Sequence, residues 1–433
     1  MSDTLQTPPK LSQIGQNMTH LSGVRAIMKD IQATINAHKD QKFYDLSAGN
    51  PLLLPEVCSM WQNTAIKLLA NENDFAQIIG RYGNSKGYQP FIEAICNDFN
   101  QRYGLNLTSK NILVTCGSSP VYFIASNAFG GKNPNGQIKK ILLPVLPDYT
   151  GYGSVTLDKN ALFGSRPKIE KNLESHSFKY VPDFDQIQID ETVGAIILSR
   201  PSNPSGNIVD KNDLQKLIDK AAKFDIPVLI DSAYSVPYPA LNYKEMEPVF
   251  GPNVLHIISM SKTGLPGERI GVAIGDEKWI EVLESFATNI AIHSSRFGQA
   301  LATQAINSGE LAQLSTFVVR PFYQNKLELI KQACHTYLNP NIPWYLHDCQ
   351  GGMFAWLWLE NLPVTDQELY NQLKEHGVIV VPGNSFFPGL QGNWQHSQEC
   401  IRLSLTSTEE SITQGIKILS EILEDLYQGF DIL

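Results

Sequence analysis

Residues 259–271 form the most informative stretch of the chain: Ser-Met-Ser-Lys-Thr-Gly-Leu-Pro-Gly-Glu-Arg-Ile-Gly. Lys262 stands among small and hydroxyl-bearing residues, directly after the apolar run 254–258, and Arg269 follows seven positions later. Small neighbours let a flat cofactor approach the backbone, and hydroxyls with an arginine can hold a phosphate. A lysine amine can form a Schiff base with an aldehyde. The plainer interpretation is a strand that ends in a Gly/Pro turn.

Short β-rich runs alternate with helical patterns on both sides of this stretch, between about residues 105 and 280. This alternation predicts an α/β fold whose large domain has a mostly parallel, seven-stranded sheet sandwiched by helices. The expected strands are 112–116, 140–145, 178–181, 195–199, 227–230, 255–259 and 269–274. Apolar residues at helical spacing predict a connecting helix between Asp210 and Phe224.

After about residue 310 the pattern predicts a smaller α+β domain, with strands at 352–359, 378–381 and 401–405. Thr365 and Glu368 have capping-box spacing at the start of a helix expected to end at His376. A final amphipathic helix is expected from about Glu409 to Tyr427. The expected domains are 1–55 (N-terminal arm and part of the small domain), 56–305 (large cofactor-binding domain) and 306–433 (small C-terminal domain).

Composition narrows the class of protein. The chain has 433 residues, of which 42% are hydrophobic, enough to fill two cores. A net charge of −9 without a basic run argues against nucleic acid as a partner. Six cysteines without CxxC pairs indicate reduced thiols and a cytoplasmic location. The N-terminus has no signal-peptide pattern, and no run reaches the roughly 18 apolar residues that span a membrane.

Polar residues that directly follow predicted strands are the best candidates for a site, because parallel α/β sheets bind ligands at the carboxyl ends of their strands. Gly117-Ser118-Ser119 precedes Pro120 at an expected helix start, where free N–H groups attract anions. Read alone, the triplet is equally well explained as an ordinary helix start. Together with Ser259, Ser261 and Arg269 it predicts a phosphate cup.

Four more polar or aromatic residues follow strands. They are Asp231, Tyr234, Asn203 and Tyr149. Each has an ordinary alternative: an aspartate at this position often caps or turns the chain, Asn-Pro with Gly is a common turn, and a tyrosine can simply lie in a surface loop. Arg402 lies within an otherwise apolar strand, where a guanidinium needs a carboxylate partner. A structural aspartate or glutamate would satisfy it as well as a substrate would.

The order of these motifs resembles that of the fold-type I, class I and II aminotransferases over nearly the whole chain. The resemblance implies pyridoxal 5'-phosphate as cofactor, with Lys262 as the Schiff-base lysine. It implies Asp231 as partner of the ring nitrogen, Tyr234 and Asn203 at the phenolic oxygen, and Tyr149 stacked on the ring. Phosphate ligands would be Gly117, Ser118, Ser259 and Arg269, with Ser119 and Ser261 beside them.

The resemblance also implies roles outside the cofactor. Arg402 matches the arginine that grips the α-carboxylate of the substrate, and Gly49 and Asn50 match the segment that closes over it. Tyr82, in residues 81–87, matches a tyrosine that reaches the phosphate of the neighbouring subunit. A homodimer with shared active sites is therefore expected, acting on amino acids and 2-oxo acids.

Five further stretches resemble the valine–pyruvate aminotransferase subgroup: 139–152, 165–170, 178–184, 199–209 and 380–390. They imply transfer between L-valine and pyruvate, giving 3-methyl-2-oxobutanoate and L-alanine by a ping-pong mechanism. An alternative is an aminotransferase whose main donor is alanine, glutamate or aspartate. Arg296 keeps it open, since an arginine there could bind a distal carboxylate and favour glutamate or aspartate. A lyase that shares Lys262 and Asp231 is a second alternative. A ligand-sensing domain of a DNA-binding regulator would need a basic extension that this sequence lacks.

Overall fold

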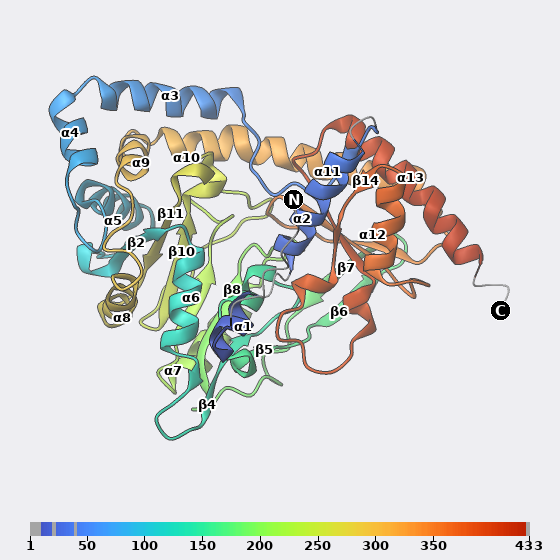
Figure 1. Cartoon of the computed structure of the whole chain (residues 1–433), viewed down its shortest axis with the longest axis horizontal. Helices are drawn as coiled ribbons and strands as arrows, with labels where there is room; N and C mark the ends of the chain where they lie inside the picture. Colours follow the sequence, from blue (N-terminus) through green and yellow to red (C-terminus); the bar gives the residue numbers. More distant parts are fainter. Residues whose placement is uncertain (1–9, 20–22, 39–40, 430–433) are drawn as a thin grey trace, which may run out of the picture.

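The computed structural model describes residues 10–19, 23–38 and 41–429, which form two main sheets covered by helices (Figure 1). No helix in these residues is long and apolar enough to cross a membrane. The α-helices are α1 (Gln13–Thr19), α2 (Val24–Ala37), α3 (Pro55–Leu69), α4 (Glu72–Gly80), α5 (Gln89–Tyr103), α6 (Ser119–Ala128), α7 (Lys211–Ala222), α8 (Glu277–Ala287), α9 (Phe297–Asn307), α10 (Glu310–Leu314), α11 (Arg320–Tyr337), α12 (Asp366–Glu375) and α13 (Glu409–Gln428).

The large sheet has the order β2-β11-β10-β9-β8-β4-β3, with β5 paired to β4. Its strands are β2 (Ile112–Cys116), β3 (Gly131–Lys132), β4 (Ile138–Leu143), β5 (Leu162–Gly164), β8 (Val193–Ser199), β9 (Val228–Asp231), β10 (Val254–Ser259) and β11 (Ile270–Ile274). The pairs β4–β8, β8–β9 and β9–β10 are parallel, whereas β11 is antiparallel to both neighbours. The prediction of a large, mostly parallel sheet is confirmed.

The number of strands and one assignment differ from expectation. Among the described residues the large sheet has eight strands instead of seven, because the short strands β3 and β5 have too few apolar residues to show in the sequence. The run expected at 178–181 is a strand, β7 (Ser177–Val181), but it belongs to the second sheet. Its residues alternate between buried and partly exposed, whereas strands inside a parallel sheet are buried on both faces.

Strand β8 shows why the large sheet needs helices on both faces. Ile196 and Leu198 pack with the apolar side of α7, while Ala195 and Ile197 belong to the core on the opposite face. Successive side chains of a strand point to opposite faces, so a strand that is apolar throughout must be covered twice. The predicted helix at 210–224 is confirmed as α7.

The second sheet has the order β15-β16-β13-β12-β7-β6. Its strands are β6 (Lys168–Asn172), β7, β12 (Trp344–His347), β13 (Phe354–Leu359), β15 (Val381–Pro382) and β16 (Cys400–Ser404). Helices α2, α12 and α13 lie on this side of the molecule (Figure 1). The capping box of Thr365 and Glu368 at the start of α12 is confirmed, and so is the final helix, α13.

The N-terminal segment is joined to this C-terminal part. Strand β1 (Tyr44–Asp45) pairs in parallel with β14 (Val378–Ile379). The backbone N–H of Leu46 donates to Ile379, and the carbonyl of Leu46 accepts from Ser404, each at 2.8 Å. Residues 44–46 thus run directly toward Gly49. The domain limits 1–55, 56–305 and 306–433 stay a prediction, of which residues 1–9, 20–22, 39–40 and 430–433 lie outside the described part.

Lys262 lies in the connection between the antiparallel strands β10 and β11, so this connection is a hairpin. Gly264 has φ +100°, and a Cβ there would lie 2.9 Å from the indole nitrogen of Trp61. That indole donates to the carbonyl of Thr263 at 2.9 Å. Helix α3, which carries Trp61, therefore holds the lysine hairpin in place, and a residue larger than glycine at position 264 would be strained.

Candidate active site

Lys262 is partly buried and points toward the segment before α3. Its Nζ donates to the carbonyl of Gly49 at 2.7 Å and lies 5.9 Å from the centre of the Tyr234 ring. Burial and, to a lesser extent, the cation of Arg402 lower the pKa of Lys262 to about 8, while Asp231 acts in the opposite direction. A substantial fraction of this amine is therefore neutral near pH 8, as a nucleophile or base must be.

Asp231 ends strand β9 and is buried. Its Oδ2 accepts from the hydroxyl of Tyr152 at 2.8 Å, and its Oδ1 accepts from the N–H of Ala233 at 3.0 Å. Burial raises the pKa of Asp231, although these hydrogen bonds and the nearby hydroxyl of Tyr122 favour the ionised form. Sequence reasoning missed both tyrosines. Tyr152 could have been found from its position in the same post-strand segment as Tyr149.

Residues of the predicted phosphate cup lie close together. Gly117 has φ +90°, and a Cβ there would lie 2.3 Å from a guanidinium nitrogen of Arg269, so glycine is required for this approach. Arg269 donates to the hydroxyl of Ser261 at 3.1 Å. Ser118 directly precedes α6, which begins at Ser119, and its side chain makes no capping hydrogen bond. The end of strand β2, the start of α6 and the lysine hairpin thus meet at one place.

The hairpin contributes a second serine to this place. Ser259 ends β10, and its hydroxyl accepts from the N–H of Ser261 at 3.2 Å. The prediction that 269–274 forms a strand holds from Ile270 onward, because Arg269 itself adopts φ 51°. This left-handed backbone turns the chain just before β11.

Arg402 lies in the middle of β16 and is only 4% exposed. Its guanidinium lies 3.8 Å from the centre of the Phe354 ring and donates to the Asn203 side-chain oxygen and the Ser47 carbonyl, each at 3.2 Å. Nε has no partner among the described residues. Burial lowers the pKa of Arg402 to about 10, so it stays a cation at neutral pH. A buried cation with a spare donor suits a carboxylate.

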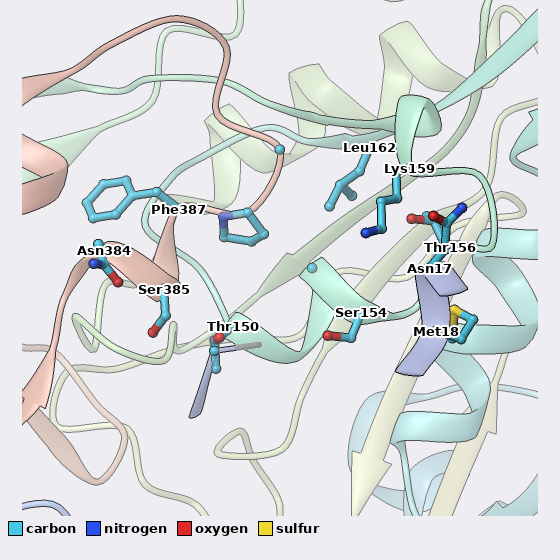
Figure 2. Close-up of a pocket in the computed structure, with 14 residues that line it drawn as sticks. Asn17, Met18, Thr150, Ser154, Thr156, Lys159, Leu162, Asn384, Ser385 and Phe387 are labelled. Carbon is cyan, nitrogen blue, oxygen red and sulfur yellow. The ribbon is translucent and has the colours of Figure 1, made fainter. Parts of the chain in front are cut away.

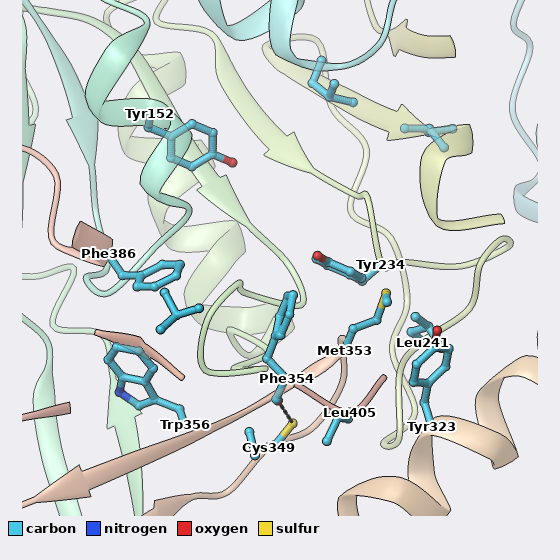
Figure 3. Close-up of a cluster of buried hydrophobic side chains, with 14 of the residues drawn as sticks. Tyr152, Tyr234, Leu241, Tyr323, Cys349, Met353, Phe354, Trp356, Phe386 and Leu405 are labelled. Atoms are coloured by element: carbon cyan, nitrogen blue, oxygen red, sulfur yellow. Dashed lines mark hydrogen bonds between the residues drawn. The ribbon is translucent and has the colours of Figure 1, made fainter. Parts of the chain in front are cut away.

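Aromatic rings surround this cation and the lysine. Figure 3 shows Tyr234, Phe354, Phe386 and Tyr152 within one cluster of buried side chains. Phe386 lies 5.1 Å from the Arg402 guanidinium, and Tyr234 packs edge-on against Phe354 at 6.4 Å. Tyr149 packs edge-on against Tyr152 at 5.4 Å. The apolar walls exclude water and so strengthen the charge interactions between them.

Gly49 bonds to Lys262, whereas its neighbour Asn50 is exposed. Tyr82 lies elsewhere on the surface: it is 83% exposed, and its ring packs on that of His293 at 5.9 Å. The structure thus brings together most of the predicted residues, and leaves Tyr82 facing outward.

Arg296 already has partners. Its guanidinium donates to the carbonyls of Gln77 and Arg81, the latter at 2.6 Å, at the end of α4. Its aliphatic part covers Gly83, where a Cβ would lie 2.9 Å from Arg296 Cδ. The side chain therefore fixes the loop that carries Tyr82.

A cavity of about 410 Å³ borders the site (Figure 2). Thr150, next to Tyr149, and Ser385, next to Phe386, form two of its walls. Sequence reasoning did not predict this cavity. Two of the stretches noted above, 139–152 and 380–390, nevertheless contribute to its lining, as do residues of α1.

These residues fit pyridoxal 5'-phosphate. The guanidinium of Arg269 lies against Gly117, close to the start of α6, and this arrangement suits a phosphate. The buried carboxylate of Asp231 suits a protonated ring nitrogen. Lys262 lies between them with a lowered pKa, and the spare Nε of Arg402 suits the carboxylate of an amino acid. The fold and the site together define a pyridoxal-phosphate enzyme of fold type I.

Comparisons with known proteins give the class. The family model for aminotransferase class I and II matches residues 169–419. The valine–pyruvate aminotransferase of Escherichia coli (strain K12) is 33% identical over 413 residues, 95% of this chain and 98% of that one. The chain belongs to the class I and II aminotransferases, and it is a pyridoxal-phosphate-dependent transaminase.

Solved structures agree. A putative amino-acid aminotransferase from Psychrobacter arcticum 273-4 has 34% identity and a TM-score of 0.90, covering 97% of this chain and all of that one. The valine–pyruvate aminotransferase of Salmonella typhimurium LT2 has 31% identity and a TM-score of 0.84, covering 93% and 99%.

Proposed function

We propose that this enzyme transfers the amino group between L-valine and pyruvate, giving 3-methyl-2-oxobutanoate and L-alanine. The observation that carries the proposal is that Arg296 donates to backbone carbonyls beside α4, whereas Arg402 is buried next to Lys262. Nε has no partner among the described residues in either arginine, so position is what distinguishes them. One such arginine suits a donor with one carboxylate and an apolar side chain. The similarity to two valine–pyruvate aminotransferases supports the same substrate pair.

The residues would divide the work as follows. Bound pyridoxal phosphate would supply an aldehyde and a ring that accepts electrons. Arg402 would hold the substrate carboxylate and so orient the Cα–H bond toward the amine of Lys262. The amine of Lys262, which is partly neutral near pH 8, would take the proton from Cα and then donate it to the cofactor. Asp231 would keep the ring nitrogen protonated.

Around the ring, Tyr149 would stack on one face, and Asn203 and Tyr234 would donate to the phenolic oxygen. The phosphate would be held by Arg269, by Ser118 and Ser119 at the start of α6, and by the hairpin serines. Gly49 and Asn50 would close over the bound substrate. These assignments are supported by the convergence of the side chains described above.

A donor panel tests the substrate proposal. The initial rate of alanine formation from pyruvate would be measured with valine, glutamate and aspartate as donors. The proposal expects valine to give the highest kcat/KM. A higher value with glutamate or aspartate would refute it in favour of an acidic donor, and release of ammonia or carbon dioxide without alanine would point to a lyase.

We also propose a homodimer with shared active sites. Seven large apolar side chains are exposed on α3, on α4 and in the loops next to them: Leu53, Ile66, Leu69, Ile79, Tyr82, Ile290 and Ile292. Helices α3 and α4 contact each other and α9, so much of this apolar surface lies on one group of elements. An exposed apolar surface of this kind suits another protein chain. Tyr82 within it would reach the phosphate of the partner.

Mixing two inactive variants tests this arrangement. If Lys262 comes from one chain and Tyr82 from the other, a mixed dimer of Lys262→Ala and Tyr82→Ala chains has one intact site. Light scattering should give twice the chain mass, and activity should return on mixing. A monomer, or a dimer that regains no activity on mixing, would contradict shared sites.

The enzyme would work in the cytoplasm. All six cysteines lie in the described residues and are free thiols, which suits a reducing compartment. Cell fractionation followed by activity measurement would test this location.

A further inference from the structure

Asp148 is a buried carboxylate, 2% exposed, that none of the roles above uses. Its Oδ1 accepts from the Ser199 hydroxyl and from the backbone N–H of Tyr149, the latter at 2.7 Å. Its Oδ2 accepts from the backbone N–H of Ser199 at 3.0 Å. A carboxylate is costly to bury unless its oxygens are hydrogen-bonded, and three donors meet that requirement here.

Both residues that donate to the Asp148 carboxylate are connected to the active site. Tyr149 is the expected stacking residue. The Ser199 hydroxyl, which donates to Asp148, accepts from the backbone N–H of Asn203 at 3.3 Å. The side-chain oxygen of Asn203 in turn accepts from Arg402 at 3.2 Å. Asp148 is therefore bonded to one wall of the site directly and to the carboxylate-binding arginine through two intermediate residues.

A third contact joins Asp148 to the other sheet. Its backbone N–H donates to the carbonyl of Phe386 at 2.9 Å, and the Phe386 ring lies 5.1 Å from the Arg402 guanidinium. The segment after β4, the end of β8 and the 384–386 turn before β16 thus meet at one residue, the first two through the carboxylate of Asp148 and the third through its backbone N–H. Burial raises the pKa of Asp148 to about 7, while the hydrogen bonds from Ser199 and Tyr149 favour the ionised form.

We propose that Asp148 is a positioning residue that fixes the Tyr149 ring and the Asn203–Arg402 pair where the cofactor ring and the substrate carboxylate need them. The proposal rests on the roles assigned to these three residues, and it does not depend on valine being the donor. A carboxylate suits this task because it accepts from several donors at once. An amide of the same shape has one acceptor oxygen, and its NH₂ would face a donor.

Glu399 provides a matched control. It is also buried, 4% exposed, and accepts from the Trp358 indole at 2.9 Å, from the Asn361 N–H at 3.0 Å and from Gln395 at 2.7 Å. None of these partners is a proposed site residue. Losing either carboxylate should lower stability, but only loss of Asp148 should disturb the site.

The test compares Asp148→Asn with Glu399→Gln. Cofactor-free protein would be titrated with pyridoxal phosphate to obtain a Kd, and KM and kcat would be measured with whichever donor the unaltered enzyme uses best. Asp148→Asn should raise the cofactor Kd and the donor KM by roughly tenfold each, since hydrogen bonds to a charged group are lost. Glu399→Gln should change both less than about twofold. Equal constants in the two variants would overturn the proposal.

A second variant separates the direct bond of Asp148 to Tyr149 from the chain of bonds that runs through Ser199 to Asn203. Ser199→Ala keeps the Asp148–Tyr149 bond but removes the hydroxyl that reaches Asn203. KM should therefore rise, and the cofactor Kd should rise less than in Asp148→Asn because Tyr149 stays fixed. In the double variant, KM should not exceed that of Asp148→Asn, because both changes break the same chain of bonds. An unchanged KM in Ser199→Ala, or additive effects on KM, would overturn the proposal even if Asp148→Asn failed to fold. Failure of the valine proposal would appear separately, in the donor panel on the unaltered enzyme.

Discussion

Arg402 and Arg296 show how the same side chain serves two different purposes. Arg402 lies between the two sheets, stacked on Phe354, with Nε unpaired among the described residues. Arg296 lies beside α4 and donates to two main-chain carbonyls that end this helix. Arg402 is buried, and polar groups of Asn203 and Ser47 lie within hydrogen-bond distance of it. Around Arg296 the neighbouring surface is apolar and exposed. The first arrangement suits a small ligand, and the second suits a protein chain.

The strongest test of the enclosed region removes its lysine. Lys262→Ala should bind cofactor without the covalent link and lose essentially all transaminase activity, because both the attachment point and the base disappear. Borohydride reduction followed by mass spectrometry should label the unaltered protein at Lys262 and leave the variant unlabelled. Full activity in the variant would refute the assignment of the site.

Removing the cation of Arg402 should have the next largest effect. Arg402→Gln should raise the KM for amino and 2-oxo acids on the order of 100-fold, because a charge-assisted pair to the carboxylate is lost. Cofactor affinity should change far less. Steady-state kinetics beside a cofactor titration distinguish the two constants, and an equal loss in both would show a general collapse of the site.

The lowered pKa of Lys262 gives a smaller, graded effect. Its amine is mostly neutral above about pH 8 and mostly protonated below it, so the rate of cofactor capture should fall about tenfold per unit below that value. Stopped-flow absorbance on cofactor-free enzyme would measure this rate. In Arg402→Gln the midpoint should move to higher pH, because a neighbouring cation that lowers the pKa is gone. A midpoint that stayed in place would contradict that cause.

The smallest effect is expected at the second arginine. Arg296→Ala should lower activity only a few-fold, by loosening the loop that carries Tyr82, and should leave the ratio of valine to glutamate turnover unchanged. The donor panel repeated on the variant measures this ratio. Selective loss of activity on acidic donors would instead mean that Arg296 binds a distal carboxylate.

The sequence alone predicts the parts of the site that depend on local order. Asp231, Asn203 and Ser259 each follow an apolar run, and the carboxyl ends of parallel strands meet at one edge, so their convergence could be expected. The Lys262 hairpin is equally local. The convergence of these residues can be predicted without knowing how the two sheets pack.

What depends on packing between distant segments could not be predicted. The stacking of Arg402 on Phe354 follows from the pairing of β13 with β16, and its bond to Asn203 joins the two sheets. The place of β7 in the second sheet depends on its pairing with β12, more than 160 residues later. Asp148 was not among the predicted site residues, because its partner Ser199 is 51 positions away.

The hairpin of β10 and β11 has a consequence for turnover. Lys262 and Arg269 belong to one short connection, so the spacing between these two residues does not depend on movements elsewhere in the chain. Arg402 arrives from the opposite end of the polypeptide on a separate sheet. A shift of that sheet is expected to loosen the hold of Arg402 on the product, whereas the distance between Lys262 and Arg269 is set within the hairpin and should stay the same.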